Sequence, residues 1–152
     1  MKRLLYIVTL AATLLCGCEK ENGESGGSKE PELTLEEKVC GEWHAQISSA
    51  QTELYAGFTE GKFELYQKVG DGVHRLYRGS WEMNDDIISG KYNDGQAWAC
   101  SYKVELSGET MKWTSADASE TIMEFRKKEI PEQVKENCMV EVKSDNSISA
   151  IW

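Results

Sequence analysis

Apolar and polar side chains alternate along much of residues 77–106, with the period of a β-strand. In the clearest stretch, every second position from 98 to 106 is apolar: Trp98, Cys100, Tyr102, Val104 and Leu106. Because successive side chains of a strand point to opposite faces, this pattern predicts one buried and one solvated face. The turn sequences NDD at 84–86 and NDGQ at 93–96 divide the stretch into three strands.

The same alternation, interrupted by glycine, asparagine and aspartate, runs through the chain from residue 41 to residue 127. It predicts eight strands, over residues 41–47, 52–58, 62–68, 73–83, 87–92, 98–106, 110–115 and 120–127. Sequential strands joined by short turns form an up-and-down meander, and such a sheet removes its unpaired edges most simply by closing. The predicted fold class is therefore all-β, a small eight-stranded antiparallel up-and-down β-barrel.

Short helical turns are predicted on both sides of the barrel. Thr34 and Glu37 have the spacing of a capping box, in which each side chain bonds the backbone N–H of the other residue. A single turn of helix should therefore lie between Thr34 and Cys40. Pro131 suits the first position of a second short helix after the last strand.

Large aromatic side chains dominate the predicted inner face. An eight-stranded barrel is just wide enough for its own side chains or for one small ligand. The candidate lumen lining is Tyr77, Trp81, Tyr92, Trp98, Tyr102, Trp113 and Phe125. These residues support two interpretations, a filled core or a lumen that stacks a small apolar or sugar-like ligand. The tail at 138–152 ends in Ile151-Trp152, and it either plugs the barrel or engages a partner.

Residues 1–17 have the organisation of a signal peptide. A basic start is followed by an apolar run from Leu4 to Leu15, which is shorter than the roughly 20 residues that a membrane span needs. The sequence Leu15-Cys16-Gly17-Cys18 resembles the bacterial lipoprotein signal, and Cys18 is the expected lipid attachment site because the small Gly17 precedes it. The alternative is a signal that is cleaved without lipidation.

Residues 18–32 are rich in charged residues, glycine and serine. Such a composition buries too little apolar surface to fold, so the sequence predicts a disordered tether. Within it, Glu19-Lys20-Glu21-Asn22 resembles the surface-export signal of lipoproteins in one group of Gram-negative gut bacteria, or it is a solvated charged linker. We therefore expect an outer-membrane lipoprotein that is periplasmic or surface-exposed.

The chain is acidic, with 17 basic and 26 acidic residues and a formal net charge of −9. Removal of the signal peptide takes away Lys2 and Arg3, which leaves 15 basic residues and a charge of −11. This charge argues against binding to nucleic acid or to anionic lipid headgroups. The expected membrane contact is through acyl chains on Cys18, in which each buried methylene contributes about 0.8 kcal/mol.

Gly41-Glu42-Trp43, at the start of the first predicted strand, looks like the Gly-x-Trp signature of the lipocalins. In that superfamily the Trp closes the barrel floor and packs under an Arg from near the last strand, so the resemblance implies the barrel-closing pair Trp43 and Arg126. The stretches 90–98 and 130–135 also resemble the small lipocalin-like domain of outer-membrane lipoproteins of Bacteroides-type gut bacteria. The resemblance covers residues 33–137 and implies a compact lipocalin-like barrel.

Three cysteines lie beyond the lipoprotein signal, and the cell envelope permits disulfides. Cys40 precedes the first predicted strand and Cys138 follows the last, so their neighbourhoods should meet in a closed barrel. Cys40 and Cys138 are the candidate disulfide, although three thiols allow other pairings. Cys100 lies in an apolar alternation and is interpreted as a small buried thiol.

The sequence predicts no metal, no cofactor and no catalytic residues. His44 and His74 lie in different strands on predicted outward faces, whereas a zinc site needs three or four converging ligands. Neither a nucleophile elbow nor a phosphate-binding loop occurs in the sequence. We expect a membrane-anchored, non-catalytic barrel that binds a small apolar ligand or a partner protein. The alternative is an acidic protein-interaction or inhibitor module with a filled barrel.

Overall fold

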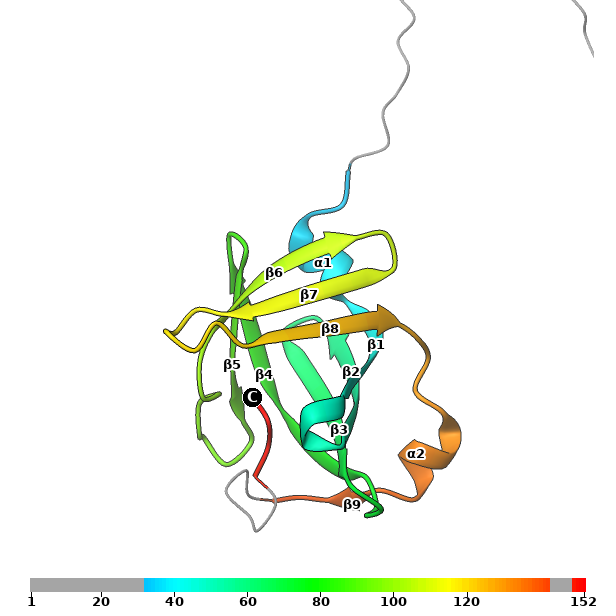
Figure 1. Ribbon diagram of the computed structural model, residues 1–152. Coiled ribbons are helices and arrows are strands. Elements are labelled where there is room, and N and C mark those ends of the chain that lie inside the picture. Colours follow the sequence, from blue (N-terminus) through cyan, green and yellow to red (C-terminus); the bar gives the residue numbers. More distant parts are fainter. Residues whose placement is uncertain (1–31, 143–148) are drawn as a thin grey trace, which may run out of the picture. The chain divides into compact units, whose positions relative to one another are not determined.

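Eight antiparallel strands follow one another around a closed barrel in the order of the chain (Figure 1). The computed structural model describes residues 32–142 and 149–152, which belong to one compact unit, Glu32–Trp152. The signal peptide predicted at 1–17, and the predicted tether as far as residue 31, lie outside the described residues. The prediction of an all-β, eight-stranded up-and-down barrel is confirmed.

The strands of the barrel are β1 (Gly41–Ile47), β2 (Thr52–Thr59), β3 (Lys62–Val69), β4 (Arg75–Asn84), β5 (Ile87–Tyr92), β6 (Tyr102–Ser107), β7 (Thr110–Ser115) and β8 (Ile122–Lys127). The helical segments are α1 (Leu35–Val39), the 3₁₀ turn η1 (Ser48–Ala50) and α2 (Glu132–Glu136). A two-residue strand, β9 (Met139–Val140), follows α2. Within residues 32–142 and 149–152, no helix is long and apolar enough to cross a membrane.

The barrel closes because the first and last strands pair with each other and β3 pairs with β4. β1 is hydrogen-bonded to both β2 and β8, and β3 to both β2 and β4. At the β1–β8 seam, Trp43 lies opposite Lys127 and His44 lies opposite Arg126. Closure of this kind satisfies the backbone groups that an open sheet would leave at its edges.

The sixth strand is shorter than the sequence predicts. β6 starts at Tyr102, and residues 98–101 leave the sheet after a single bridge between Lys91 and Ala97. The backbone N–H of Trp98 donates to the carbonyl of Gly90 at 3.0 Å. The Trp98 ring packs so closely on Gly90 that a Cβ atom added to this glycine would lie only 2.5 Å from the ring. The alternation at 98–101 therefore reflects a loop that packs its side chains inward.

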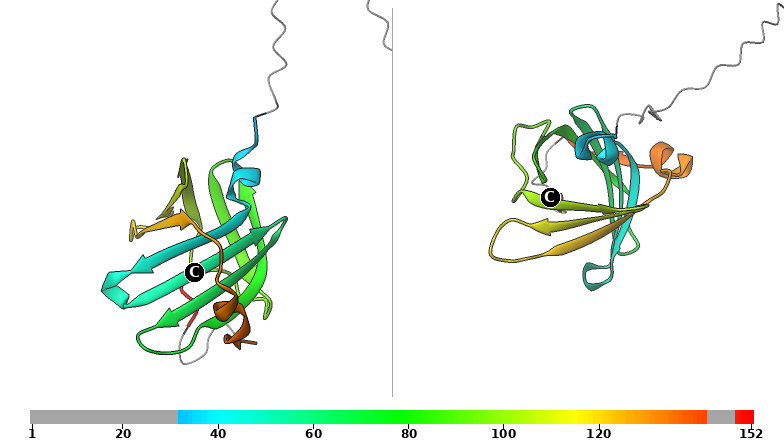
Figure 2. Two further views of the ribbon diagram at one scale, coloured as in Figure 1. Left: turned by 90° about the vertical axis from the view of Figure 1, so that its right-hand side faces the viewer. Right: turned by 90° about the horizontal axis from the view of Figure 1, so that it is seen from above.

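A second apolar cluster lies on the outer face of the wall, separate from the interior. It buries Tyr55, Tyr66, Leu76 and Ile130, with Val134 and Cys138 packed against them. The α2 region supplies the covering residues, and α2 lies outside the ring of strands in Figure 1 and in the view from above in Figure 2. For this reason β2 and β3 have consecutive buried residues, and a strict alternation of buried and exposed positions fails there.

β9 attaches the start of the tail to the wall. It pairs in parallel with β4, with Met139 opposite Arg75 and Val140 opposite Leu76. Leu76 also pairs with Tyr66 of β3, so β9 occupies the other edge of β4, beyond the last β4–β5 pair at Gly79. The tail predicted at 138–152 is thus continuous with the barrel sheet at its beginning.

The helical turn α1 fixes the tryptophan at the start of β1. The predicted capping box is confirmed, because Glu37 Oε2 accepts the Thr34 N–H at 2.7 Å and Thr34 Oγ1 accepts the Glu37 N–H at 3.2 Å. At the other end of α1, the Val39 carbonyl accepts the indole N–H of Trp43 at 2.8 Å. The second helix begins at Glu132, one residue later than predicted, with Pro131 as its N-cap.

Replacement of Trp43 by alanine tests its place in the core. Trp43 is 1% exposed, so Trp43→Ala should lower the free energy of unfolding by about 3–5 kcal/mol in urea denaturation. Ile122→Ala is the matched control, because Ile122 is 59% exposed and its truncation should change stability by less than about 0.5 kcal/mol. Equal effects of the two substitutions would contradict the core assignment.

Candidate functional site

All seven aromatic residues of the candidate lumen lining lie in the interior of the barrel. Tyr77, Trp81, Tyr92, Trp98, Tyr102, Trp113 and Phe125 are buried and belong to one core cluster. Phe58 and Phe63 join them from β2 and β3. The interior is therefore aromatic on all sides, and the position of these residues follows from the inward register of their strands or, for Trp98, from the loop before β6.

The centre of this interior is occupied by Trp152, which belongs to no strand. Its side chain is 2% exposed, and its ring lies 4.8 Å from Trp98, 5.2 Å from Trp113, 5.3 Å from Phe63 and 5.7 Å from Phe58, between ring centroids. Views from three sides place the end of the chain within the ring of strands (Figures 1 and 2). Of the two arrangements left open by the sequence, residues 149–152 adopt the one inside the barrel.

Gln67 on β3 holds the backbone of the tail. Its Nε2 donates to the carbonyl of Ser149 at 2.9 Å, and its Oε1 accepts the backbone N–H of Ile151 at 2.9 Å. Gln67 is 4% exposed and follows the inward-facing Phe63 and Leu65 of the same strand. A polar residue at an inward position of a predicted strand is the sequence signal that could have indicated this contact.

Tyr92 holds the tail at a second point, because its hydroxyl donates to the carbonyl of Trp152 at 2.9 Å. Burial raises the pKa of the Tyr92 phenol far above its usual value, so the hydroxyl keeps its proton and remains a donor throughout the physiological pH range. The tail is thus bound through backbone groups by Gln67 and Tyr92, and through its ring by the aromatic interior.

Several indole N–H groups of the interior lack acceptors. The buried Nε1 atoms of Trp98, Trp113 and Trp152 have no hydrogen-bond partner among the described residues. In contrast, Trp81 Nε1 donates to the carbonyl of Thr59 at 2.8 Å. Unpaired buried donors carry a desolvation cost, so the centre of the barrel has unused hydrogen-bonding capacity.

The predicted pairing of Trp43 with Arg126 is not formed. Arg126 is exposed and lies opposite His44 on the outer face, whereas Lys127 lies opposite Trp43. The Nζ atom of Lys127 is 5.8 Å from the centroid of the Trp43 ring, a cation–π distance. The residue opposite Trp43 is thus one position later than predicted, and in a strand one position changes the face on which a side chain lies.

The predicted disulfide between Cys40 and Cys138 is also not formed, since Cys40, Cys100 and Cys138 are all free thiols. Cys40 packs against the interior cluster, whereas Cys138 packs against the outer cluster next to α2. The barrel wall therefore separates the two sulfur atoms. Cys100 is half-buried and also packs against the interior, close to its predicted role.

His44 and His74 converge on a single carboxylate on the outer face. Glu53 lies with its carboxylate oxygens 3.3 Å from His44 Nε2 and 3.5 Å from His74 Nε2, and Lys68 Nζ is 3.2 Å away. This cluster was missed because the residues come from β1, β2, β3 and the segment before β4. No group of three or more His, Cys, Asp or Glu side chains in the described parts of the chain is placed to hold a metal ion.

Burial and charge shift the pKa values of His74 and Glu53. Desolvation lowers the pKa of His74, and the opposing attraction of Glu53 does not offset it. Burial alone would raise the pKa of Glu53, but hydrogen bonds from Lys68 and His44 outweigh it and hold that pKa below its usual value. The folded state therefore favours a neutral His74 beside an ionised Glu53.

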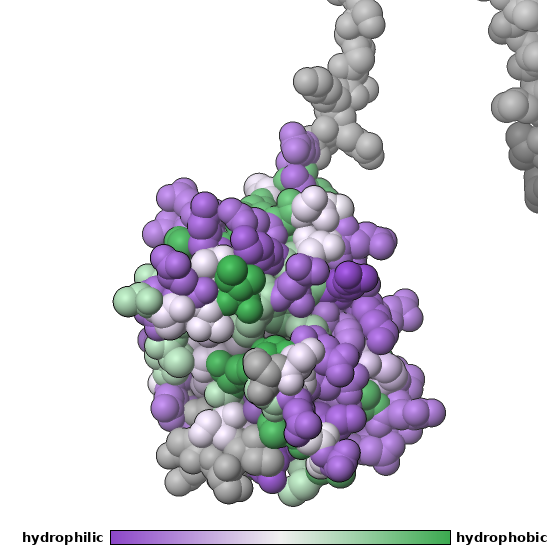
Figure 3. Space-filling view, in the orientation of Figure 1, coloured by the Kyte–Doolittle hydropathy of each residue, from purple (hydrophilic) through white to green (hydrophobic). Residues whose placement is uncertain are grey.

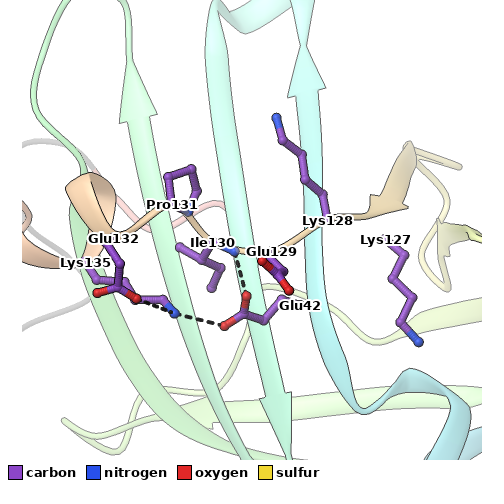
Figure 4. A pocket seen from close by; sticks show the side chains of 8 residues that line it. All are labelled: Glu42, Lys127, Lys128, Glu129, Ile130, Pro131, Glu132 and Lys135. Atoms are coloured by element: carbon purple, nitrogen blue, oxygen red, sulfur yellow. Dashed lines mark hydrogen bonds and ion pairs between the residues drawn. The ribbon is translucent and has the colours of Figure 1, made fainter.

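A hollow on the outer surface is lined by residues of β1, β8 and the segment up to α2 (Figure 4). Glu42 accepts the backbone N–H of Ile130 at 2.6 Å and pairs with Lys135 at 3.2 Å, and Lys135 also pairs with Glu132 at 3.5 Å. These groups bind one another across the hollow, as the dashed lines in Figure 4 show. We interpret these contacts as the attachment of α2 to the barrel wall. We take the lumen as the candidate functional site.

The titration of His74 provides a test of its buried position beside Glu53. The pKa of His74 is lower in the folded state than the unfolded value of about 6.5, so the unfolded state binds more protons below that pH. Stability should therefore be fully present above about pH 6.5 and decline as the pH falls through the folded pKa, measured as the urea midpoint. His74→Gln should flatten this decline. A decline that is identical in wild type and variant would assign it to other groups.

No protein-family model and no curated protein matches this chain. Among solved structures, the chain is similar to the crystal structure of an uncharacterised protein from Bacteroides eggerthii, with a TM-score of 0.43 and 19% sequence identity. The match covers 59% of this chain and 98% of the other one.

Proposed function

We propose that this protein is a lipid-anchored protein of the cell envelope whose barrel binds without catalysis. In this proposal, acyl chains on Cys18 attach the chain to the outer membrane, on its periplasmic or outer side. The lumen takes a small apolar ligand or a segment of a partner protein in exchange for Trp152. The proposal joins the lipoprotein-like leader of the sequence to the aromatic interior of the barrel.

The observation that carries the proposal is the position of Trp152. The wall of the barrel is made by β1–β8, whose strands pair with one another without the tail. A residue from outside the strands fills the centre of the lumen, where it contacts four aromatic rings. Withdrawal of Trp152 would leave an aromatic site about the size of its own ring system, which suits a flat apolar ligand.

The exposed apolar residues near β9 favour a second candidate, an acidic interaction module whose barrel stays filled. Met139, Val140 and Val142 are between 51% and 81% exposed, beside the β3–β4 turn that carries the half-exposed Val73. On the face drawn in Figure 3, hydrophilic side chains predominate, with hydrophobic side chains among them. Under this candidate the tail is a permanent part of the core, and partners meet the outer surface.

Binding of naphthalene separates the two candidates. If a ligand exchanges with Trp152, the wild type should bind naphthalene weakly in a fluorescence titration. Trp152→Ala removes the competing ring and should bind naphthalene about tenfold more tightly. Val140→Ala, an exposed substitution, should bind like the wild type. If neither the wild type nor Trp152→Ala binds naphthalene, the filled-barrel module replaces the exchange proposal.

The lipid anchor is tested by metabolic labelling. With an alkyne analogue of palmitate in a Gram-negative host, the full chain should carry the label, and Cys18→Ser should lose it because the acylated sulfur is gone. Cys16→Ser is the control and should be labelled like the wild type, since it leaves Gly17-Cys18 intact. Label that remains on Cys18→Ser would contradict acylation at this position.

A further inference from the structure

We infer that the ligand of the lumen is an extended peptide segment that carries an aromatic side chain, and that residues 149–152 are the intramolecular occupant of this peptide site. The inference rests on the proposed function, because it assigns a chemical class to the ligand of the same lumen. It is carried by the way Gln67 and Tyr92 contact the tail.

Gln67 is unusual among the buried polar residues of the described chain, which are Thr52, Gln67 and Ser115. Thr52 donates to the carbonyl of Ala50 at its own turn, and Ser115 bonds the nearby 119–121 segment. Of these three residues, only Gln67 uses both the nitrogen and the oxygen of its side-chain amide to bind a segment outside the wall. An inward Gln at this position therefore serves whatever occupies the lumen.

The two groups that Gln67 contacts are those that a neighbouring strand would contact. The carbonyl of Ser149 and the N–H of Ile151 flank residue 150 and point to the same side, as they do in an extended strand. Gln67 thus takes the place of a partner strand and recognises backbone, not side chains. This recognition is open to any extended peptide that brings a carbonyl and, two residues later, an N–H.

A purely apolar ligand would leave the Gln67 amide buried without partners, which is unfavourable. A peptide supplies both partners and also a further carbonyl for the Tyr92 hydroxyl, which now binds that of Trp152. The contacts of Gln67 and Tyr92 therefore follow one peptide backbone from residue 149 to residue 152. This continuity is the reason for choosing a peptide over other small molecules.

The preference for an aromatic side chain in the peptide comes from the pocket that holds the Trp152 ring. Trp152 packs against Phe58, Phe63, Trp98 and Trp113 at centroid distances of 4.8–5.7 Å. The unpaired Nε1 groups of Trp98 and Trp113 offer two more donors to an occupant that carries an acceptor. A tyrosine or tryptophan in a partner peptide suits this pocket, whereas an alanine would leave it empty.

The experiment uses the full chain with Cys18→Ser and Trp152→Ala, which weakens the competing tail. The probe is the blocked tetrapeptide acetyl-Ser-Ala-Ile-Trp-amide, titrated by calorimetry. Two matched peptides test the two halves of the site. One has Ala in place of Trp, and the other has an N-methyl group on Ile, which removes the N–H that Gln67 accepts. We expect each change to weaken binding about tenfold or more.

Gln67→Met in the same chain provides the matched protein variant, because Met has a similar length and no hydrogen-bonding amide. It should weaken the binding of the peptide about tenfold without weakening the binding of naphthalene, which has no group that bonds the amide. Retained naphthalene binding also shows that the variant is folded. Naphthalene binding together with no peptide binding, or equal binding of the N-methylated peptide, would overturn the inference and leave the proposed function intact. If neither naphthalene nor the peptide binds, both the inference and the proposed function are overturned.

Discussion

Filling the interior is the constraint on which the rest of this structure depends. A closed cylinder of eight strands must pack its inner face at the density of a protein interior, or lose the contacts that stabilise it. Here the strands supply aromatic rings all around but leave the centre to Trp152, a residue that no strand carries. The wall is held by backbone pairing and the centre by a segment joined to the wall through the short β9–β4 pair. Wall and centre are thus distinct structural parts, and only the wall is closed on itself.

The inner and outer sides of the wall are organised differently. The inner side is aromatic, with Gln67 and Tyr92 directed at the tail. The outer side carries ion pairs, such as the one between Arg78 and Glu64 at 2.7 Å, and a second apolar cluster beneath α2. The Glu42 contacts with Ile130 and Lys135 attach the α2 segment to the outer side. The aromatic interior and the apolar cluster beneath α2 are therefore formed by separate sets of residues.

Much of the fold could be predicted from local pattern, because the strand period and the turn residues lie within a few positions of one another. Eight strands, their order and the inward aromatic residues follow from that pattern, and the capping box of α1 follows from a spacing of three residues. The pattern failed where a long-range contact decided the outcome. Trp98 mimics a strand residue because its ring packs on Gly90, and Lys127 takes the place predicted for Arg126 because the β1–β8 register differs by one residue. Gln67 contacts the tail, and two histidines contact Glu53. These residues are distant in the sequence or lie on different strands, so a local pattern could not predict that they meet.

The place of residues 149–152 in the chain also bears on how the protein folds. Their contacts reach back 60, 82 and 84 residues, to Tyr92 and Gln67, and they follow all eight strands in the sequence. Contacts of such separation form late, because the loop between the partners must close first. The β1–β8 pairing that closes the wall joins residues of similar separation, so closure of the wall and docking of residues 149–152 are both expected late in folding. Until residues 149–152 dock, the aromatic interior lacks its central ring.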